Sequence, residues 1–158
     1  MRKALRLAAV LAALCLNRSG WADEFSPLGR WLTEDQRGAI EIYACGEQLC
    51  GRIAWQYQPL GPDGHLKLDR NNPSPSLRTH PLCGLPIMSG FRRAGADAPN
   101  EWNGGSIYDP GSGNTYSAKL TMKGANTMEL RGYLVIPLLG QTQTWQRDTE
   151  PRPPCPRD

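Results

Sequence analysis

The sequence predicts an all-β fold, a small antiparallel barrel of about eight strands with one long proline-rich loop. Three observations carry this prediction. Apolar and polar residues alternate in several short segments, as in half-buried strands. Turn signals recur between these segments. The 17 glycines and 14 prolines among 158 residues disfavour long helices. A two-sheet sandwich is the alternative arrangement of the same strands.

Residues 1–22 have the features of an export signal. The segment begins with basic residues, continues with the apolar run Leu7–Leu16 and ends in small residues up to Ala22. The alternative is a membrane anchor, but ten apolar residues are too short to cross a bilayer core, which takes about 20. We therefore expect a signal peptide cleaved after Ala22, a periplasmic or secreted mature protein, and no membrane span after cleavage.

The net charge of +3 comes largely from this segment. It contains four of the 18 basic residues and no acid, so the remaining chain has 14 bases against 15 acids. A mature protein this close to neutral offers no electrostatic footprint for nucleic acid, and we expect no nucleic-acid partner.

The first predicted strands are Gly29–Leu32, Ala39–Cys45 and Leu49–Trp55. Folding the second and third at Glu47-Gln48 places Ile40 opposite Trp55 on the inner face, and Cys45 opposite Cys50 on the outer face.

Export makes disulfides the expected state of the four cysteines that remain after cleavage. Opposed strand positions lie close enough for a Cys45–Cys50 bridge, and Cys155 is the candidate partner of Cys83. Free thiols are the alternative. A zinc site is a second alternative, but the C-x4-C spacing is poor for zinc coordination, and no metal is expected.

Further strands alternate in the second half of the chain. They are predicted at Ser106–Tyr108, Tyr116–Met122, Met128–Leu134 and Gln141–Arg147. The stretch 58–100 is rich in proline and is predicted as a long ordered loop with one short strand near Leu85–Met88. The predicted organisation is therefore a signal peptide at 1–22, a barrel domain at 23–148 and an extended proline-rich tail at 149–158.

Several phrases in fixed order carry a family resemblance. They are CGEQLCGRI (45–53), Asp69 with Asn72-Pro73 and Leu77-Arg78, PLCGL (81–85), WNGGSIYDP (102–110), GNTY (113–116), LRGY (130–133) and LGQTQTWQR (139–147). Together they resemble the domain of unknown function 2147 family of exported bacterial proteins over about residues 27–148. The resemblance implies an exported β-rich domain and supplies no activity. Ser74 stands where the family pattern has an acid, and Gln141 where it has a base.

A second resemblance concerns the fold. Gly29-Arg30-Trp31 in the first strand and Trp145-Gln146-Arg147 in the last are similar to the lipocalin and calycin pattern. The resemblance implies an early Trp that closes one end of the barrel and a late Arg packed over it, in a cation–π contact.

The long loop contains a polar group, Asp69, Asn72 and Arg78, that would orient a ligand. The alternative is loop architecture, with Asx turns and an Arg that caps carbonyls. Trp102 beside Gly104-Gly105 would stack on a flat group; the alternative is a core Trp at a β-bulge.

Four further residues complete the predicted ligand contacts. They are Trp31, Trp55, Tyr108 and Arg131, of which Arg131 has outward strand parity. The inward Trp residues would either line a cavity or fill the barrel, and Gly51 and Gly132 on the inner face would leave room inside.

The sequence contains no nucleophile elbow, phosphate loop or zinc-protease motif, and no catalytic residue or cofactor is indicated. The first hypothesis is a non-enzymatic protein that binds a small hydrophobic or amphiphilic ligand in the barrel. The second is a structural or interaction module of the cell envelope with a filled barrel and a protein partner. The third is an enzyme that uses Asp69 or Asp109 as a base.

Overall fold

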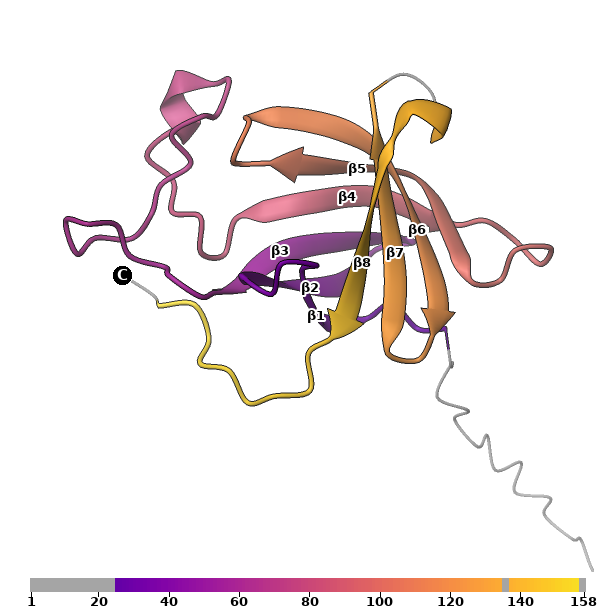
Figure 1. The fold of residues 1–158 in the computed structure, drawn as a ribbon. Helices are drawn as coiled ribbons and strands as arrows, with labels where there is room; N and C mark the ends of the chain where they lie inside the picture. The colour runs from indigo at the N-terminus through magenta and orange to yellow at the C-terminus, as the bar shows by residue number, and fades with distance from the viewer. Residues whose placement is uncertain (1–24, 135–136, 157–158) are drawn as a thin grey trace, which may run out of the picture.

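The computed structural model of the chain describes residues 25–134 and 137–156 (Figure 1). The predicted signal peptide and its cleavage after Ala22 lie outside these residues. Eight strands close into an antiparallel barrel in which each strand pairs with its neighbours in sequence and β8 returns to β1. The strands are β1 Gly29–Leu32, β2 Gly38–Cys45, β3 Gln48–Gln56, β4 Pro86–Arg93, β5 Glu101–Asp109, β6 Asn114–Gly124, β7 Thr127–Tyr133 and β8 Gln141–Arg147. Two single-turn 3₁₀ helices, η1 Pro75–Leu77 and η2 Pro137–Leu139, lie in the connections.

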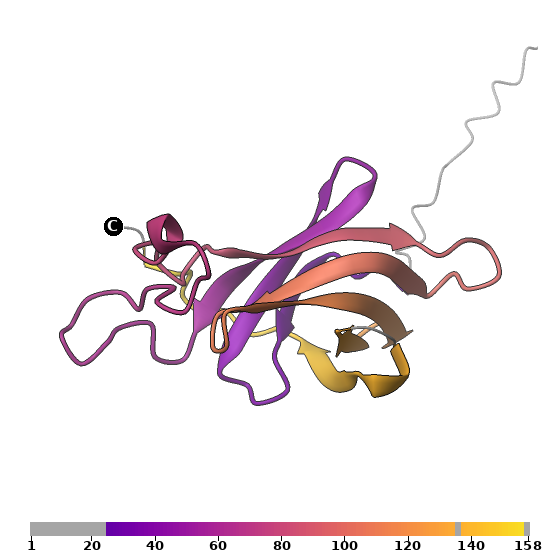
Figure 2. The ribbon, with the colours of Figure 1, turned by 90° about the horizontal axis from the view of Figure 1, so that it is seen from above.

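The predicted loop and its short strand need correction. The long connection spans 57–85, and β4 is a full strand of eight residues. Residues 94–100 form a separate loop, and Figure 2 shows the two loops at opposite ends of the molecule. Prolines and glycines masked the alternation of β4, because Pro86 begins the strand and Gly90 adopts a φ of 82° within it.

The register of the β2–β3 hairpin differs from the prediction. Ile40 pairs with Ile53 rather than Trp55, and Tyr43 rather than Cys45 lies opposite Cys50. The turn centres on Gly46-Glu47, because Gly46 supplies the positive φ (69°) that a two-residue hairpin loop requires. Cys45 still bonds to Cys50, from a diagonal position with the two Cα atoms 5.8 Å apart.

A bulge in β3 turns Trp55 away from the barrel interior. Ala39 pairs with Trp55 and Ile40 with Ile53, so Ala54 is an extra residue on β3. Trp55 is consequently only partly buried, on the outer face, with the Arg152 guanidinium 4.7 Å from its ring centroid.

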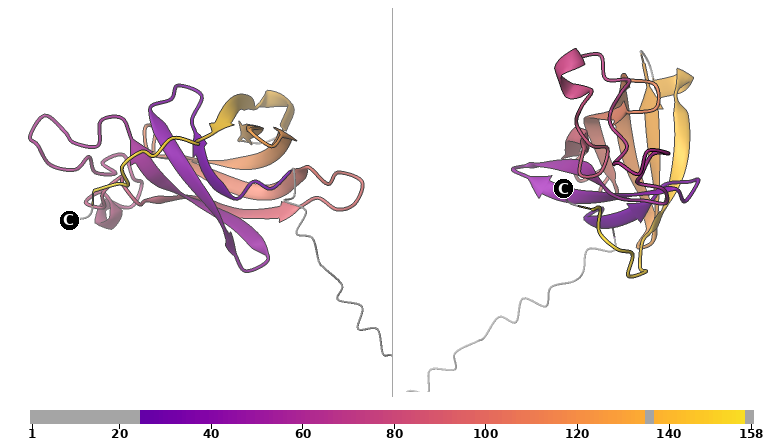
Figure 3. Two further views of the ribbon diagram at one scale, coloured as in Figure 1. Left: turned by 90° about the horizontal axis from the view of Figure 1, so that it is seen from below. Right: turned by 90° about the vertical axis from the view of Figure 1, so that its left-hand side faces the viewer.

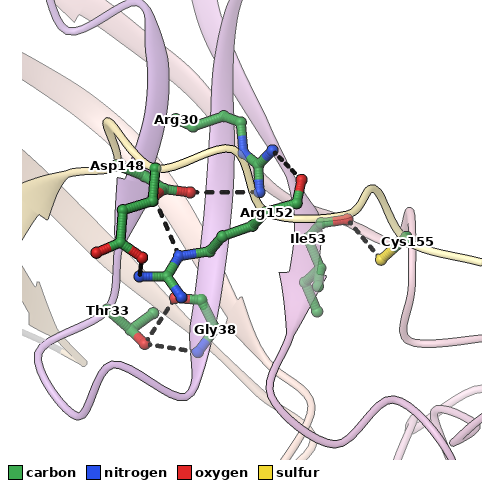
Figure 4. Close-up of polar contacts among 8 residues, drawn as sticks. Arg30, Thr33, Gly38, Ile53, Asp148, Arg152 and Cys155 are labelled. Carbon is green, nitrogen blue, oxygen red and sulfur yellow. Dashed lines mark hydrogen bonds and ion pairs between the residues drawn. The ribbon is translucent and has the colours of Figure 1, made fainter.

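The C-terminal segment crosses the outside of β1–β3 as an extended chain (Figure 3). Its anchor is the buried Asp148 carboxylate, which pairs with Arg30 at 3.3 Å and with Arg152 at 3.1 Å (Figure 4). The segment ends at a disulfide between Cys155 and Cys83. The bond joins the tail to the end of the long 57–85 loop.

The two ends of the barrel are filled differently. One end holds a packed core, which includes Trp31, Phe91, Trp102, Met122 and Met128. This end is closed by Trp31, whose ring lies 4.2 Å from the Arg147 guanidinium, as the lipocalin-like pattern implied. In the part of the chain that the structure describes, no helix is long and apolar enough to cross a membrane.

Candidate functional site

The other end of the barrel opens into a cavity of about 910 Å³. Its mouth is formed by the β1–β2 loop at 33–37, the β5–β6 turn, Leu134 and Leu139 between β7 and β8, and Leu82 of the long loop. This size falls within the range of small-molecule pockets, roughly 300–1,000 Å³. The cavity is therefore large enough for a drug-sized or lipid-sized molecule.

The floor of the cavity is apolar. Inward residues of several strands meet there: Ile40, Ile53, Ile87, Ile107, Leu130 and Trp145. They face inward because side chains on a strand alternate between its two faces. Trp145 is 2% exposed, and its indole N–H donates to the Gln143 side-chain oxygen at 2.9 Å, so its polar atom is satisfied within the wall.

Gly132 leaves space in the wall, whereas Gly51 does not. A Cβ at Gly132 would meet only ordinary van der Waals neighbours, the nearest being the Tyr116 Cβ at 3.7 Å. A Cβ at Gly51 would lie 2.9 Å from the Met88 sulfur, because Met88 already fills that part of the interior. Of the two glycines expected to leave room, only Gly132 lines the cavity.

A polar network supports the mouth beside Tyr108. The Tyr108 hydroxyl donates to Asp69 Oδ1 at 2.7 Å, and the Asn72 amide donates to Asp69 Oδ2 at 2.7 Å. Asp69 is fully buried and Asn72 is 8% exposed. Burial and the bond to the Asp69 carboxylate raise the pKa of Tyr108 to about 12. Tyr108 therefore keeps its proton throughout the physiological pH range.

The long loop is fastened to the barrel at this network. Within the loop, the Arg78 Nε donates to the Asn72 backbone oxygen at 2.7 Å. The Asn71 amide connects the loop to the β5–β6 turn, because it donates to the Pro110 and Gly111 carbonyls at 3.0 and 2.8 Å. Gly113 must remain glycine here, because a Cβ would collide with the Asn71 carbonyl and φ is +74°. The loop thus holds the β5–β6 turn at the edge of the mouth.

The predicted contact residues divide into two groups. Tyr108 lines the cavity, and Asp69, Asn72 and Arg78 lie behind it as a connected group. The other four lie elsewhere: Trp31 and Trp102 in the packed core, Trp55 beneath the tail, and Arg131 on the outer face, where it donates to Thr142 and to the Leu138 carbonyl. A bulge lies between Trp102 and Gly105, which agrees with the alternative of a core Trp at a β-bulge.

Sequence reasoning did not assign Trp145, Tyr116, Gln143, Glu34 or Asp35 to a ligand site, and it named Asp109 only as a candidate base. The strand alternation placed Tyr116 on the inner face. However, alternation alone does not tell which inward positions lie in the packed half and which in the open half. No cluster of three or more His, Cys, Asp or Glu side chains suited to a metal is present within residues 25–134 and 137–156.

Residues 29–147 match a protein family described as "Uncharacterized protein conserved in bacteria (DUF2147)". The match spans nearly the whole barrel, from the first residue of β1 to the last of β8. The chain belongs to the DUF2147 family. No curated protein matches the sequence of this DUF2147 protein.

A solved structure shares the fold of this DUF2147 protein. It is described as "Protein HP1028 from the human pathogen Helicobacter pylori belongs to the lipocalin family". The superposition has a TM-score of 0.66 at 22% sequence identity and covers 78% of this chain and 83% of that chain. The similarity confirms a lipocalin-like barrel and, at this identity, concerns the fold alone.

Proposed function

We propose that this DUF2147 protein is an exported, non-enzymatic binding protein of the periplasm or the extracellular space. It holds a small hydrophobic or amphiphilic ligand in the open half of its barrel. The observation that carries the proposal is the cavity of about 910 Å³, with an apolar floor and a polar mouth. A cavity that is apolar at its floor and polar at its mouth suits a ligand that has an apolar body and a polar end.

Export is supported by the chemistry of the chain. The structure contains two disulfides, and such bonds persist in oxidising compartments. The N-terminal sequence carries the features of a signal peptide.

Native mass spectrometry tests both parts of the proposal. The full chain is expressed for export in a bacterial host, and the processed protein is purified without detergent. A reproducible excess mass that disappears on denaturation supports a carried ligand, and the denatured mass reports the cleavage site and both disulfides. A protein that retains its N-terminal segment contradicts the export proposal. An apo protein that also binds no added twelve-carbon amphiphile in titration calorimetry contradicts the binding proposal.

A second candidate function is an interaction module of the cell envelope. The observation that favours it is a group of exposed leucines around the β7–β8 connection, Leu134, Leu138 and Leu139, which are 71%, 82% and 78% exposed. In this alternative the protein co-purifies with one defined envelope protein after crosslinking. Replacement by Ser of Leu138, which does not line the cavity, abolishes that contact and leaves small-molecule binding unchanged.

A further inference from the structure

The mouth of the cavity carries more negative than positive charge. Its lining contains three acidic residues, Glu34, Asp35 and Asp109, and one basic residue, Arg37. Hydrogen bonds from Thr33 and from the Arg37 backbone, together with the Arg37 charge, lower the pKa of Asp35. Asp35 therefore stays ionised, and Arg37 offsets its charge.

The other two acids keep an uncompensated charge. Glu34 accepts a hydrogen bond from the Thr144 backbone N–H at 3.3 Å. The Asp109 oxygens accept from the Gly111 N–H and the Ser112 hydroxyl, at 2.9 and 2.7 Å. Neither carboxylate takes part in the ion pairs formed within the described part of the chain. Hydrogen bonds position these groups without neutralising them, so both contribute negative potential to the mouth.

A fourth acid, Asp69, lies behind the part of the wall that Tyr108 forms. Asp69 is fully buried, and its two oxygens accept hydrogen bonds from the uncharged Tyr108 and Asn72 side chains rather than from a cation.

Tyr108 lines the cavity, and its hydroxyl already donates to Asp69. A tyrosine hydroxyl has a single proton, and in Tyr108 that proton is used in the 2.7 Å bond to Asp69. Only the oxygen lone pairs remain for another partner. A ligand that binds Tyr108 must therefore donate a hydrogen bond, which alcohols, amides and ammonium groups do and carboxylates or sulfates do not.

We propose that the cavity selects amphiphiles whose head group donates hydrogen bonds and carries no negative charge, and that it discriminates against fatty acids and other anionic amphiphiles. The apolar body lies on the floor against Leu130 and Trp145, and the head group lies at the mouth beside Tyr108. This inference rests on the proposed binding function and names the class of ligand for the same cavity.

Three probes with the same twelve-carbon chain test the inference: dodecylammonium, dodecan-1-ol and dodecanoate. Each is titrated into the processed exported protein by calorimetry at neutral pH and low ionic strength. We expect dodecylammonium to bind about tenfold more tightly than dodecanoate. Dodecan-1-ol should also bind more tightly than dodecanoate. High salt should reduce the difference in affinity between dodecylammonium and dodecanoate, because salt screens the charges. Dodecanoate binding as tightly as the other two overturns the inference and leaves the binding function intact. Binding of none of the three overturns both.

Variants identify the groups responsible. The double variant Glu34→Gln/Asp109→Asn keeps hydrogen-bond acceptors and removes both charges, so the ratio between dodecylammonium and dodecanoate should fall to about twofold. Asp97→Asn removes an exposed acid in the loop between β4 and β5; it is the matched control and should leave the ratio unchanged. An unchanged ratio in the double variant overturns the role of the mouth carboxylates.

Tyr108→Phe tests the hydrogen-bond acceptor. It should weaken the binding of dodecan-1-ol and leave the binding of dodecanoate unaffected.

Discussion

Arg147 joins the closed end of the barrel to the chain before β1. Its guanidinium covers the Trp31 ring and donates to three backbone oxygens, those of Ala125, Leu28 and Ser26, at 2.7, 2.9 and 2.8 Å. Burial lowers the pKa of Arg147, yet arginine remains charged at any physiological pH. One side chain thus fixes three segments that are far apart in the sequence.

We expect Arg147→Ala to cost about 3 kcal/mol of the free energy of unfolding, because the cation–π contact and the charged hydrogen bonds are lost together. Arg147→Lys should retain only part of this stabilisation, since an ammonium group lacks the planar guanidinium that reaches three carbonyls. Urea denaturation of the processed protein measures both. Arg92→Ala removes an exposed side chain and serves as the control. A loss below about 0.5 kcal/mol for Arg147→Ala would contradict this role.

The raised pKa of Tyr108 predicts that the stability of the folded protein depends on pH. An unfolded chain releases the tyrosine proton near pH 10.0, whereas the folded protein keeps it to about pH 12. The stabilisation from this group is therefore complete below pH 10 and is lost as pH rises towards 12. Urea midpoints measured across this window should fall less steeply for Tyr108→Phe than for the native protein. Tyr57→Phe, at a 66% exposed site, should follow the native curve; equal slopes for Tyr108→Phe and the native protein would contradict the prediction.

The β2–β3 hairpin shows, at the scale of one element, what strand alternation can and cannot predict. The positions of both strands and the Cys45–Cys50 bridge follow from the sequence. The register does not, because Gly46 moves the turn by one residue and a bulge at Ala54 moves Trp55 to the outer face. Bulges depend on how neighbouring strands and the tail pack, and the local sequence does not specify them.

The two disulfides should differ in their contribution to stability. Cys83 and Cys155 are 72 residues apart in the sequence and Cys45 and Cys50 only five, so the first bond restricts the unfolded chain more. We expect Cys83→Ser/Cys155→Ser to cost about 4 kcal/mol of the free energy of unfolding and Cys45→Ser/Cys50→Ser about 2 kcal/mol. Urea denaturation of both double variants provides matched measurements. The reverse order would contradict the loop-length argument.

At the scale of the whole molecule, the barrel is half filled and half open. Large residues such as Trp31, Phe91 and Trp102 fill one end, and the loops 33–37 and 57–85 border the open end. On the sequence alone, a filled barrel and a cavity are alternatives, whereas the structure contains both. The packed half gives rigidity, and the open half provides the volume that the proposed function uses.

Filling the cavity from its wall should abolish binding without unfolding the protein. Gly132→Leu adds a side chain where a Cβ meets no close neighbour and where φ is not in the left-handed region. We expect at least about tenfold weaker binding of dodecan-1-ol, with a melting temperature within about 4 °C of the native value. Glu129→Leu, a β7 position of opposite parity, is the control. Undiminished binding in Gly132→Leu would place the ligand outside the barrel.

The sequence by itself determined the all-β class, most strand positions and the Cys45–Cys50 bridge. It offered Cys155 only as a candidate partner for Cys83, and the contact between Trp31 and Arg147 was implied by the resemblance to the lipocalin pattern. These features depend on local alternation, on turn residues and on short motifs, all of which are visible along the chain. Tertiary structure alone decided that Asp69 and Tyr108, 39 residues apart, meet at the mouth, and that the inward residues divide into a core and a cavity wall. Both results depend on barrel closure and on the path of the long loop. These bring together residues that are far apart in the chain, and local sequence patterns do not specify such contacts.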